Sequence, residues 1–251
     1  MMPAPRTRVP AMSRVYAIPT ERMHLALMLA LTFTTGINDA VGYLGLDKVF
    51  TGNMTGNVVI LGMALAGGSG LPILGPALAL AGFMAGAAVG GRTLRRAERR
   101  WTPGTTVLFA AVSATMVALA IALFIAGDHP EHEVMLTVTT IAAAAMGIQA
   151  AAARTVAVKD VTTVVVTSTI TGLAADSVFG SGRGGGTGRR TAAVISLIAG
   201  AAIGVALMRV HMGTALLVAG VVIAGVAVVG AIHDSPAGRR YRSSAEKSAS
   251  D

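Results

Sequence analysis

The chain contains 251 residues, of which 53% are hydrophobic and only 13% are charged, and its mean hydropathy is +0.69. A soluble domain carries about 25% charged residues, so this composition excludes an ordinary soluble domain and favours a lipid bilayer as the solvent. The net charge of +8 does not indicate a nucleic-acid partner, because the basic residues flank apolar segments, and the absence of cysteine excludes disulfides and thiolate chemistry.

In chain order, six apolar segments are each long enough to cross a membrane as a helix. They are residues 23–46, 71–91, 105–126, 134–153, 191–208 and 213–232. Two further segments, 51–66 and 161–175, are apolar but shorter and richer in Thr, Gly and Asn. The predicted fold is therefore an all-α integral membrane protein, with six transmembrane helices plus two re-entrant or short helices.

The two tails are polar and basic. Residues 1–22 and 233–251 are expected to be disordered or to lie on an anionic membrane surface. Nothing in the first tail matches a cleaved signal peptide, so we expect residues 23–46 to remain as the first span. Residues 23–232 then form a single transmembrane domain, in which the glycine-rich residues 180–188 serve as a flexible linker.

The distribution of charge predicts the topology. If both shorter segments enter and leave the membrane on the same side, all 20 Lys and Arg residues except Lys48 and Arg209 lie on the side of the two termini. If both shorter segments cross the membrane, the basic residues are divided almost evenly. The positive-inside rule favours the first arrangement, with both termini in the cytoplasm.

A weak internal repeat follows from this topology. Residues 36–40 resemble residues 147–151, and the motif at 50–56 resembles residues 166–172. The halves, about 23–127 and 132–232, would then have opposite orientations. Inverted repeats with interrupted helices that meet near the midplane are typical of many transporters and channels.

The most informative motif is the pair of Thr-Gly-Asn triplets in residues 51–57. Polar side chains at membrane depth are candidate site residues, because the bilayer core offers them no hydrogen bonds. For Asp39 three roles are open: it binds a proton or cation, it holds the re-entrant segment, or it is a hydrated interfacial carboxylate. The motif residues either bind a solute or cap and pack a short helix. The candidate substrate-binding residues are Asn38, Asp39, Thr51, Asn53, Thr55, Asn57, Gln149, Thr167 and Thr171.

Catalytic and metal-binding patterns are weak. The acidic, histidine-containing loop at 128–133 lacks the spacing that places two ligands on one helical face. His24, His211 and His233 are scattered at the ends of spans, where an interfacial histidine is more common than a catalytic one. We therefore expect no enzyme, no cofactor and no metal site.

Residues 36–43 followed by residues 49–57 resemble the YoaK-like family of bacterial multi-pass membrane proteins, closely over 36–62 and loosely over about 23–232. Members usually have Gln-Asn where this chain has Gln149-Ala150. The resemblance implies the inner membrane of a bacterium, and it supplies neither substrate nor catalytic residues. Two hypotheses remain: a small secondary transporter or channel for an unidentified polar solute or ion, and a non-transporting scaffold or subunit of a membrane complex. Besides the bilayer and the solute, a homo-oligomer is left open as a partner.

Overall fold

The computed structural model describes residues 15–97, 100–127, 129–156, 166–177, 180–182 and 186–250. Throughout these residues the regular secondary structure is helical, without strands. Six helices are long and apolar enough to cross a membrane, which confirms the predicted number of spans. These are α2 (Thr20–Gly45), α4 (Leu74–Thr93), α5 (Pro103–Ala126), α6 (His132–Val156), α8 (Thr187–Met208) and α9 (Met212–His233).

The two shorter apolar segments contain the short helices α3 (Met54–Leu65) and α7 (Val166–Ala175). Residues 161–165 of the second segment lie outside the described residues. The same holds for residues 1–14 of the expected N-terminal tail and residues 183–185 of the expected linker. The sequence analysis thus located the six long helices and the two short apolar helices where the chain is described.

Local chemistry defines where the helices begin and end. At the start of α5, the Thr102 hydroxyl accepts a hydrogen bond from the Thr105 backbone and the Thr105 hydroxyl accepts one from Thr102, a reciprocal capping box. Pro103 occupies the first helical position, where its missing N–H is not needed. The helix ends at Ala126, and the next residue, Gly127, has a φ of 81° that is readily adopted only by glycine.

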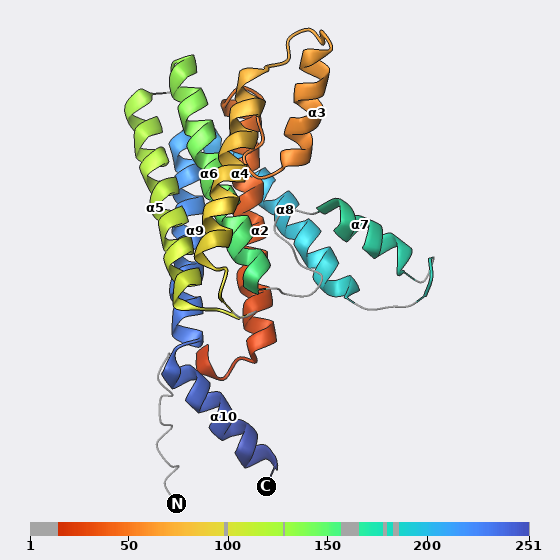
Figure 1. The fold of residues 1–251 in the computed structure, drawn as a ribbon, viewed down its shortest axis with the longest axis vertical. Coiled ribbons are helices and arrows are strands. Elements are labelled where there is room, and N and C mark those ends of the chain that lie inside the picture. Colours follow the sequence, from red (N-terminus) through yellow and green to blue (C-terminus); the bar gives the residue numbers. More distant parts are fainter. Residues whose placement is uncertain are drawn as a thin grey trace, which may run out of the picture.

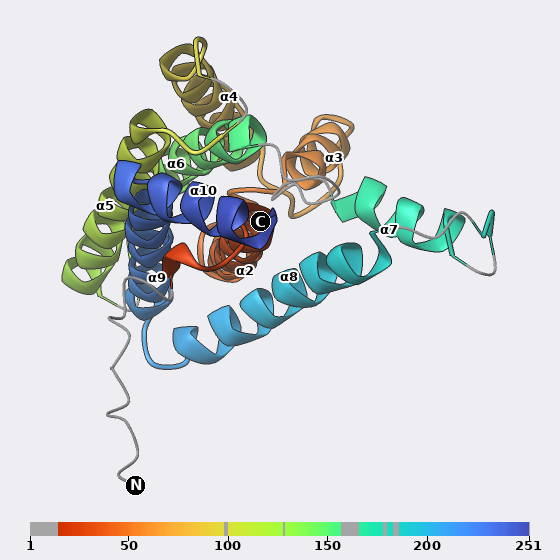
Figure 2. The same ribbon diagram turned by 90° about the horizontal axis from the view of Figure 1, so that it is seen from below.

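The spans form a bundle in which α2 lies near the middle (Figures 1 and 2). Helix α2 packs against α8, α9 and α6, and α5 packs against α9 and α6. The short helices lie outside this core, α3 against α4 and α7 against α8. Figure 2 shows α7 projecting away from the bundle beyond the first turns of α8.

Glycine brings α2 and α8 into backbone contact. A Cβ added at Gly36 would overlap the carbonyl oxygen of Leu197 and lie 2.8 Å from the backbone nitrogen of Ala201. A Cβ added at Gly200 would likewise overlap the carbonyl oxygen of Phe33. Small residues permit such close approach between helices in a membrane, where lipid provides no hydrophobic driving force for their association.

The same contacts recur between α6 and α4. A Cβ added at Gly147 would overlap the carbonyl oxygen of Phe83 and lie 2.9 Å from the Ala87 nitrogen, and one added at Gly86 would overlap the Ala144 carbonyl. Each α6 residue follows its α2 counterpart by 111 positions (36 to 147, 33 to 144). Each α8 residue follows its α4 counterpart by 114 positions (83 to 197, 86 to 200, 87 to 201). The two helix pairs therefore use equivalent contacts in the same order.

Helices α5 and α9 close the other side of the core. The Ser113 hydroxyl donates to the carbonyl of Gly220 over 2.8 Å, so a polar side chain of α5 is satisfied by the α9 backbone. Phe109, Met116 and Ile223 are fully buried between these helices and their neighbours. On the outer surface large apolar side chains are exposed, such as Ile125 at 82%. Such a surface is suited to lipid rather than water.

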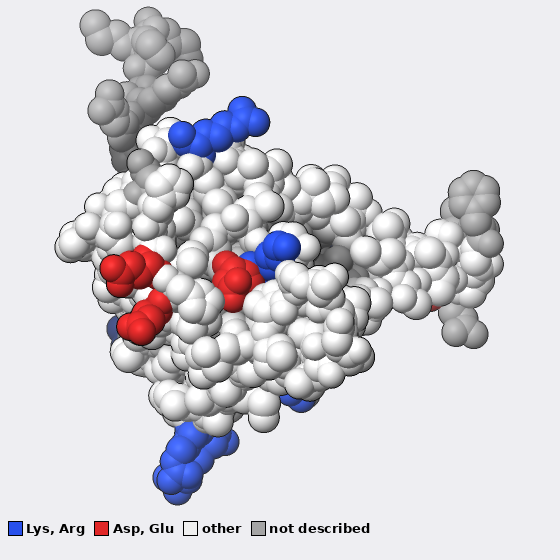
Figure 3. Space-filling model, turned by 90° about the horizontal axis from the view of Figure 1, so that it is seen from above, with Lys and Arg blue, Asp and Glu red and all other residues white. Residues whose placement is uncertain are grey.

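Charged side chains gather at the two ends of the bundle. The first turn of α2 and the last turn of α9 lie at the same end (Figure 1). The described basic residues at that end include Arg92, Arg95, Arg96, Arg100, Arg154, Arg189 and Arg190. At the opposite end the described basic residues are Lys48 and Arg209. Figure 3 shows this opposite end as a mostly uncharged surface with a few separate charged side chains.

The C-terminal segment differs from the expected disordered chain. Residues Pro236–Ser250 form a helix, α10, directly after α9. Its base is tied to the end of α9, because Arg242 donates to the His233 carbonyl over 2.8 Å and Arg239 donates to the Asp234 carbonyl. These polar contacts with the end of α9, together with Ala, Arg, Lys and Glu as good helix formers, explain why a polar composition does not produce disorder here.

Candidate functional site

The Thr-Gly-Asn motif begins where the chain turns back after α2. Asp47 and Lys48 have φ values of 62° and 55°, and this left-handed pair reverses the chain. The Val49 N–H then donates to the carbonyl of Gly42 over 3.2 Å, so the strand-like return runs along the last turns of α2. Gly42 has no side chain to block this approach, since a Cβ there would overlap the Val49 carbonyl oxygen.

The return reaches the middle of the membrane-spanning length. A Cβ added at Gly52 would lie 2.9 Å from the side chain of Thr35 and 3.3 Å from that of Met146. Thr35 precedes the end of α2 at Gly45 by ten residues, or ~15 Å at 1.5 Å per residue. That is about half the ~30 Å hydrocarbon thickness of a bilayer. Residues 50–53 therefore lie beside the middle part of α2, and at this position their backbone groups need partners from the protein.

The carboxylate of Asp39 supplies those partners. Its Oδ1 accepts hydrogen bonds from the backbone N–H groups of Gly52 at 2.7 Å, Thr51 at 3.0 Å and Asn53 at 3.4 Å. The Thr51 hydroxyl donates to the same oxygen at 3.4 Å. Three successive N–H groups converging on one oxygen form an anion-binding concavity, which an internal carboxylate occupies here. Of the roles open for Asp39, the geometry supports holding the interrupted segment.

The two asparagines of the motif are also engaged within it. The Asn57 side chain accepts from the Phe50 N–H at 2.8 Å and donates to the Phe50 carbonyl at 2.6 Å, so it replaces a missing backbone partner on both sides. The Asn53 side chain caps α3 by accepting from the Gly56 N–H at 3.4 Å. The motif thus builds the transition from extended chain to helix with its own amides.

A second polar group lies between α2 and α6. Asn38 donates to the sulfur of Met146 at 3.2 Å, and Gln149 donates to the Thr35 hydroxyl at 3.4 Å. Asn38 is 1% exposed and Gln149 is fully buried. The side-chain oxygens Asn38 Oδ1 and Gln149 Oε1 lack a hydrogen-bond partner in the structure, as does Thr139 Oγ1 on α6. An unsatisfied buried acceptor costs about 1–3 kcal/mol, so a group of three needs an explanation.

The remaining candidates are placed elsewhere. Thr55 is exposed on α3, and Thr167 and Thr171 are exposed on α7. The Thr171 hydroxyl donates to the Thr167 carbonyl one turn back, a bond within the helix itself. The described contacts of these three residues do not join them to the α2–α6 group. Thr35 was not among the sequence candidates, although it lies three residues before Asn38 on the same face of α2 and accepts a hydrogen bond from Gln149. Thr139 was not among them either.

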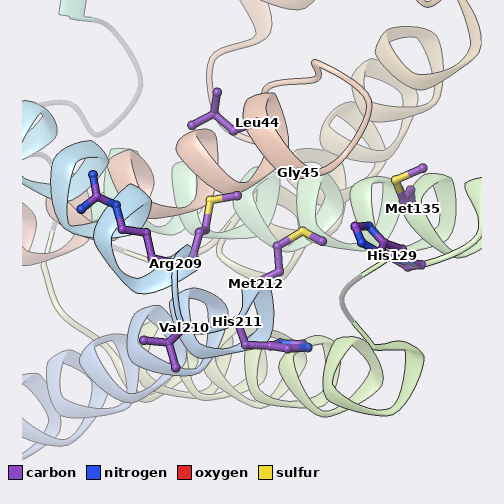
Figure 4. Close-up of a pocket in the computed structure, with 10 residues that line it drawn as sticks. Leu44, Gly45, His129, Met135, Arg209, Val210, His211 and Met212 are labelled. Atoms are coloured by element: carbon purple, nitrogen blue, oxygen red, sulfur yellow. The ribbon is translucent and has the colours of Figure 1, made fainter.

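A cavity of about 600 Å³ opens at the end of the bundle where α2 ends (Figure 4). Leu44, Gly45, His129 and Arg209 line it, together with methionines of α6, α8 and α9. Figure 4 shows His129 and Met135 on one side of this space and Arg209 on the other. Gly45 follows Asn38 by seven residues on α2, so the cavity lies ~10 Å along the helix from the buried carboxamides.

Comparison with known proteins identifies relatives without a described activity. The family model described as "Protein of unknown function (DUF1275)" matches residues 27–229. UPF0700 transmembrane protein YoaK from Bacillus subtilis (strain 168) is 31% identical over 151 residues, which cover 60% of this chain and 65% of YoaK. The match thus spans just under two thirds of that relative's length. No solved structure matches the chain.

Proposed function

Because the chain belongs to the DUF1275 family of proteins of unknown function, which supplies no activity, we propose a function from the structure: a small secondary transporter or channel for a polar solute or ion. The observation that carries the proposal is the pair of buried carboxamides, Asn38 and Gln149, whose oxygens lack partners at the α2–α6 contact. Polar groups left unsatisfied at membrane depth are expensive and typically mark a solute pathway.

The helix packing supports an inverted repeat. The α2–α8 and α4–α6 pairs use equivalent glycine contacts, and Asn38 of the first half corresponds to Gln149 of the second half by the same offset of 111 positions. The contacts of Thr35 with Gln149 and of Asn38 with Met146 indicate that α2 and α6 run antiparallel. Transporters with inverted repeats bind their substrates near the midplane, where the two halves meet.

The unpartnered atoms indicate the class of substrate. The loop N–H groups, which would suit an anion, are already occupied by Asp39. What is left free between α2 and α6 is a pair of acceptors, the two carboxamide oxygens. The Thr139 hydroxyl, which also lacks a partner, lies ten residues before Gln149, or ~15 Å along α6. Acceptors bind cations or hydrogen-bond donors, so we propose a monovalent cation or a small hydroxyl- or amide-bearing solute. The cavity near Gly45 would then serve as its vestibule.

The proposed location is the inner membrane of a bacterium, with both termini in the cytoplasm. The end at which α2 begins carries most of the described basic residues, which supports this orientation under the positive-inside rule. In this orientation the α3 segment is re-entrant from the outside. Helix α3 starts next to the middle of α2 and runs back to the end of the bundle at which α2 ends (Figure 1). We further propose that the protein is not an enzyme.

The test replaces the carboxamides by apolar side chains of similar size, in Asn38→Leu and Gln149→Met. If the two carboxamides have no role in binding, each substitution removes an unsatisfied acceptor. The stability of the protein is then unchanged or raised, and its flux is unchanged. If the carboxamides bind solute, both variants lose flux by at least about tenfold in proteoliposomes. The flux of cations is measured with radioactive rubidium or sodium, and the flux of glycerol and urea is measured by light scattering. Thr115→Val on α5 is the matched control. Unchanged flux in a stable Asn38→Leu protein would contradict the assignment.

A scaffold or subunit without transport activity is the second candidate, and one observation favours it. Asp39, Asn53 and Asn57 direct their hydrogen bonds to their own segment, so folding alone accounts for the motif. This alternative predicts no flux for either solute class in the unsubstituted protein. It also predicts a membrane partner that copurifies in fixed stoichiometry.

A further inference from the structure

Two histidines from opposite ends of the sequence meet an aspartate where α2 begins and α9 ends. His24 lies in the second turn of α2, His233 is the last residue of α9, and Asp234 follows it. The Oδ2 atom of Asp234 lies 2.9 Å from His24 Nε2 and 3.4 Å from His233 Nδ1, and the three atoms lie within 4.8 Å of one another. His24 is 7% exposed and His233 is fully buried.

One tautomer of His233 presents a ligand atom to the same space as Asp234. His233 Nε2 lies 3.0 Å from the carbonyl oxygen of Ile18, an acceptor, and 3.1 Å from an N–H donor of Arg242, so these neighbours are compatible with either tautomer. When Nε2 donates to Ile18, Nδ1 directs a lone pair at the carboxylate oxygen 3.4 Å away. Two acceptors that face each other in a buried place repel unless a cation lies between them.

The two oxygens of the Asp234 carboxylate face different partners. Arg242 lies 3.9 Å from Oδ1 and donates to the His233 carbonyl at 2.8 Å. One carboxylate oxygen therefore faces the guanidinium, while Oδ2 faces the two imidazoles.

We propose that His24 Nε2, His233 Nδ1 and Asp234 Oδ2 form a three-ligand site for a divalent transition-metal cation of the zinc type. Zinc bonds to nitrogen and oxygen are about 2.0–2.2 Å long, which in a tetrahedron places neighbouring ligand atoms ~3.3–3.5 Å apart. The 3.4 Å separation of His233 and Asp234 already has this value. His24 has to adjust so that its Nε2, now 2.9 Å from Asp234 and within 4.8 Å of the His233 nitrogen, lies at that distance from both. The fourth position is left to water.

The surroundings resemble those of a structural metal site. Metal-binding histidines typically donate their second N–H to a carbonyl or carboxylate, and the contact from His233 to Ile18 has this form. The ring of Trp101 lies 6.1 Å from that of His24 and covers one side. A bound cation would fasten the start of α2 to the end of α9 and to the base of α10. This inference revises the expectation of scattered, unrelated histidines and is independent of the transport proposal.

The experiment uses the full chain in detergent, without a polyhistidine tag and stripped of metal by a chelator. Titration with Co²⁺ is followed by its visible d–d absorption, and titration with Zn²⁺ by calorimetry. We expect one equivalent per chain, with the intense bands of tetrahedral Co²⁺. His24→Gln and Asp234→Asn each weaken binding by more than the roughly 10–100-fold that loss of an outer-shell partner costs.

His132→Gln is the matched control, because His132 is exposed at the start of α6, at the other end of the bundle. This variant keeps the full stoichiometry and affinity. The unsubstituted protein tests the proposal even if a ligand variant fails to fold. If this protein is helical and monodisperse but takes up no Co²⁺ or Zn²⁺, the proposal is overturned. Equal uptake by the His24→Gln and unsubstituted chains, or loss of uptake in His132→Gln, also overturns it.

Discussion

The return of the chain along α2 depends on the Asp39 carboxylate, so Asp39→Ala is expected to release residues 50–53 from α2. In the native protein Asp39 accepts the two short hydrogen bonds from Gly52 at 2.7 Å and Thr51 at 3.0 Å. Replacement by alanine leaves both N–H groups beside α2 without an acceptor. Residues 50–53 then open away from α2, while the six spans, which are held by other contacts, stay assembled.

The magnitude follows from the two short bonds. A hydrogen bond to a charged group contributes about 1.5–3 kcal/mol, so loss of both costs about 3–6 kcal/mol of local stability. Since 1.4 kcal/mol is a factor of ten, even the lower figure raises the open population about 100-fold. Asp39→Asn keeps a carbonyl oxygen in place but removes the charge, which about halves the strength of each bond. The open population of Asp39→Asn should therefore lie between those of the unsubstituted protein and of Asp39→Ala.

The natural absence of cysteine provides a clean assay, because one introduced thiol is the only one in the chain. Val49 is fully buried and packs against Ala79 and Ala143, so Val49→Cys reports opening of the return. Labelling by a maleimide in detergent measures the open fraction when closing is faster than the reaction. We expect the labelling rate to rise in the order unsubstituted, Asp39→Asn, Asp39→Ala.

Asp47→Asn is the control, because it removes a charge in the same reversal of the chain but leaves the acceptor of the three N–H groups intact. It should label at nearly the unsubstituted rate, since asparagine also tolerates the left-handed conformation found at this position. The reasoning is refuted if Asp39→Ala labels no faster than the unsubstituted protein. It is also refuted if Asp47→Asn accelerates labelling as much as Asp39→Ala does.

Two further predictions concern packing and topology. Gly36→Ala and Gly147→Ala each press a methyl group against a facing backbone and should each lower the free energy of unfolding in mixed micelles by about 1–3 kcal/mol. Gly91→Ala, whose added Cβ meets nothing within 4 Å, should raise it by up to about 1 kcal/mol, and equal effects at all three positions would contradict the packing argument. Single cysteines at exposed Ser69 and Arg96 should react with an impermeant maleimide on intact cells at Ser69 alone, and the reverse result would overturn the proposed orientation.

The spans were predictable because a bilayer demands about 20 apolar residues per helix, and the chain signals each one by composition. The ends of the helices were less predictable than the spans. Helix α6 begins at His132 and continues to Val156, beyond the predicted 134–153, because polar residues extend a helix past its apolar part. Gly82, Gly86 and Gly90 form a small-residue stripe of the kind that permits close helix packing, but its partner on α6 depends on the tertiary structure.

The site was predictable in part. The placement of Asp39 before the Thr-Gly-Asn motif indicated that one of its roles was to hold the segment, since the partners lie only 12 to 14 residues apart. The sequence did not indicate the unsatisfied oxygens of Asn38 and Gln149, which result from burial between two helices. No local pattern encodes the contact of His24 with Asp234, because 210 residues separate them. The helical C-terminal segment was missed because its polar composition was taken as a sign of disorder, although it contains good helix formers.

The spacing of these contacts along the chain has a consequence for biogenesis. As the ribosome releases the chain from its N-terminus, Asp39 meets the N–H groups of Thr51 and Gly52 after little more than a dozen further residues, so the return can close while the second half is still unmade. Gln149 finds Thr35 only 114 residues later. During that interval the polar face of α2 has lipid, or the insertion machinery, as its neighbour. A nascent chain arrested before α6 should therefore hold its return closed yet still recruit whatever factor shields α2.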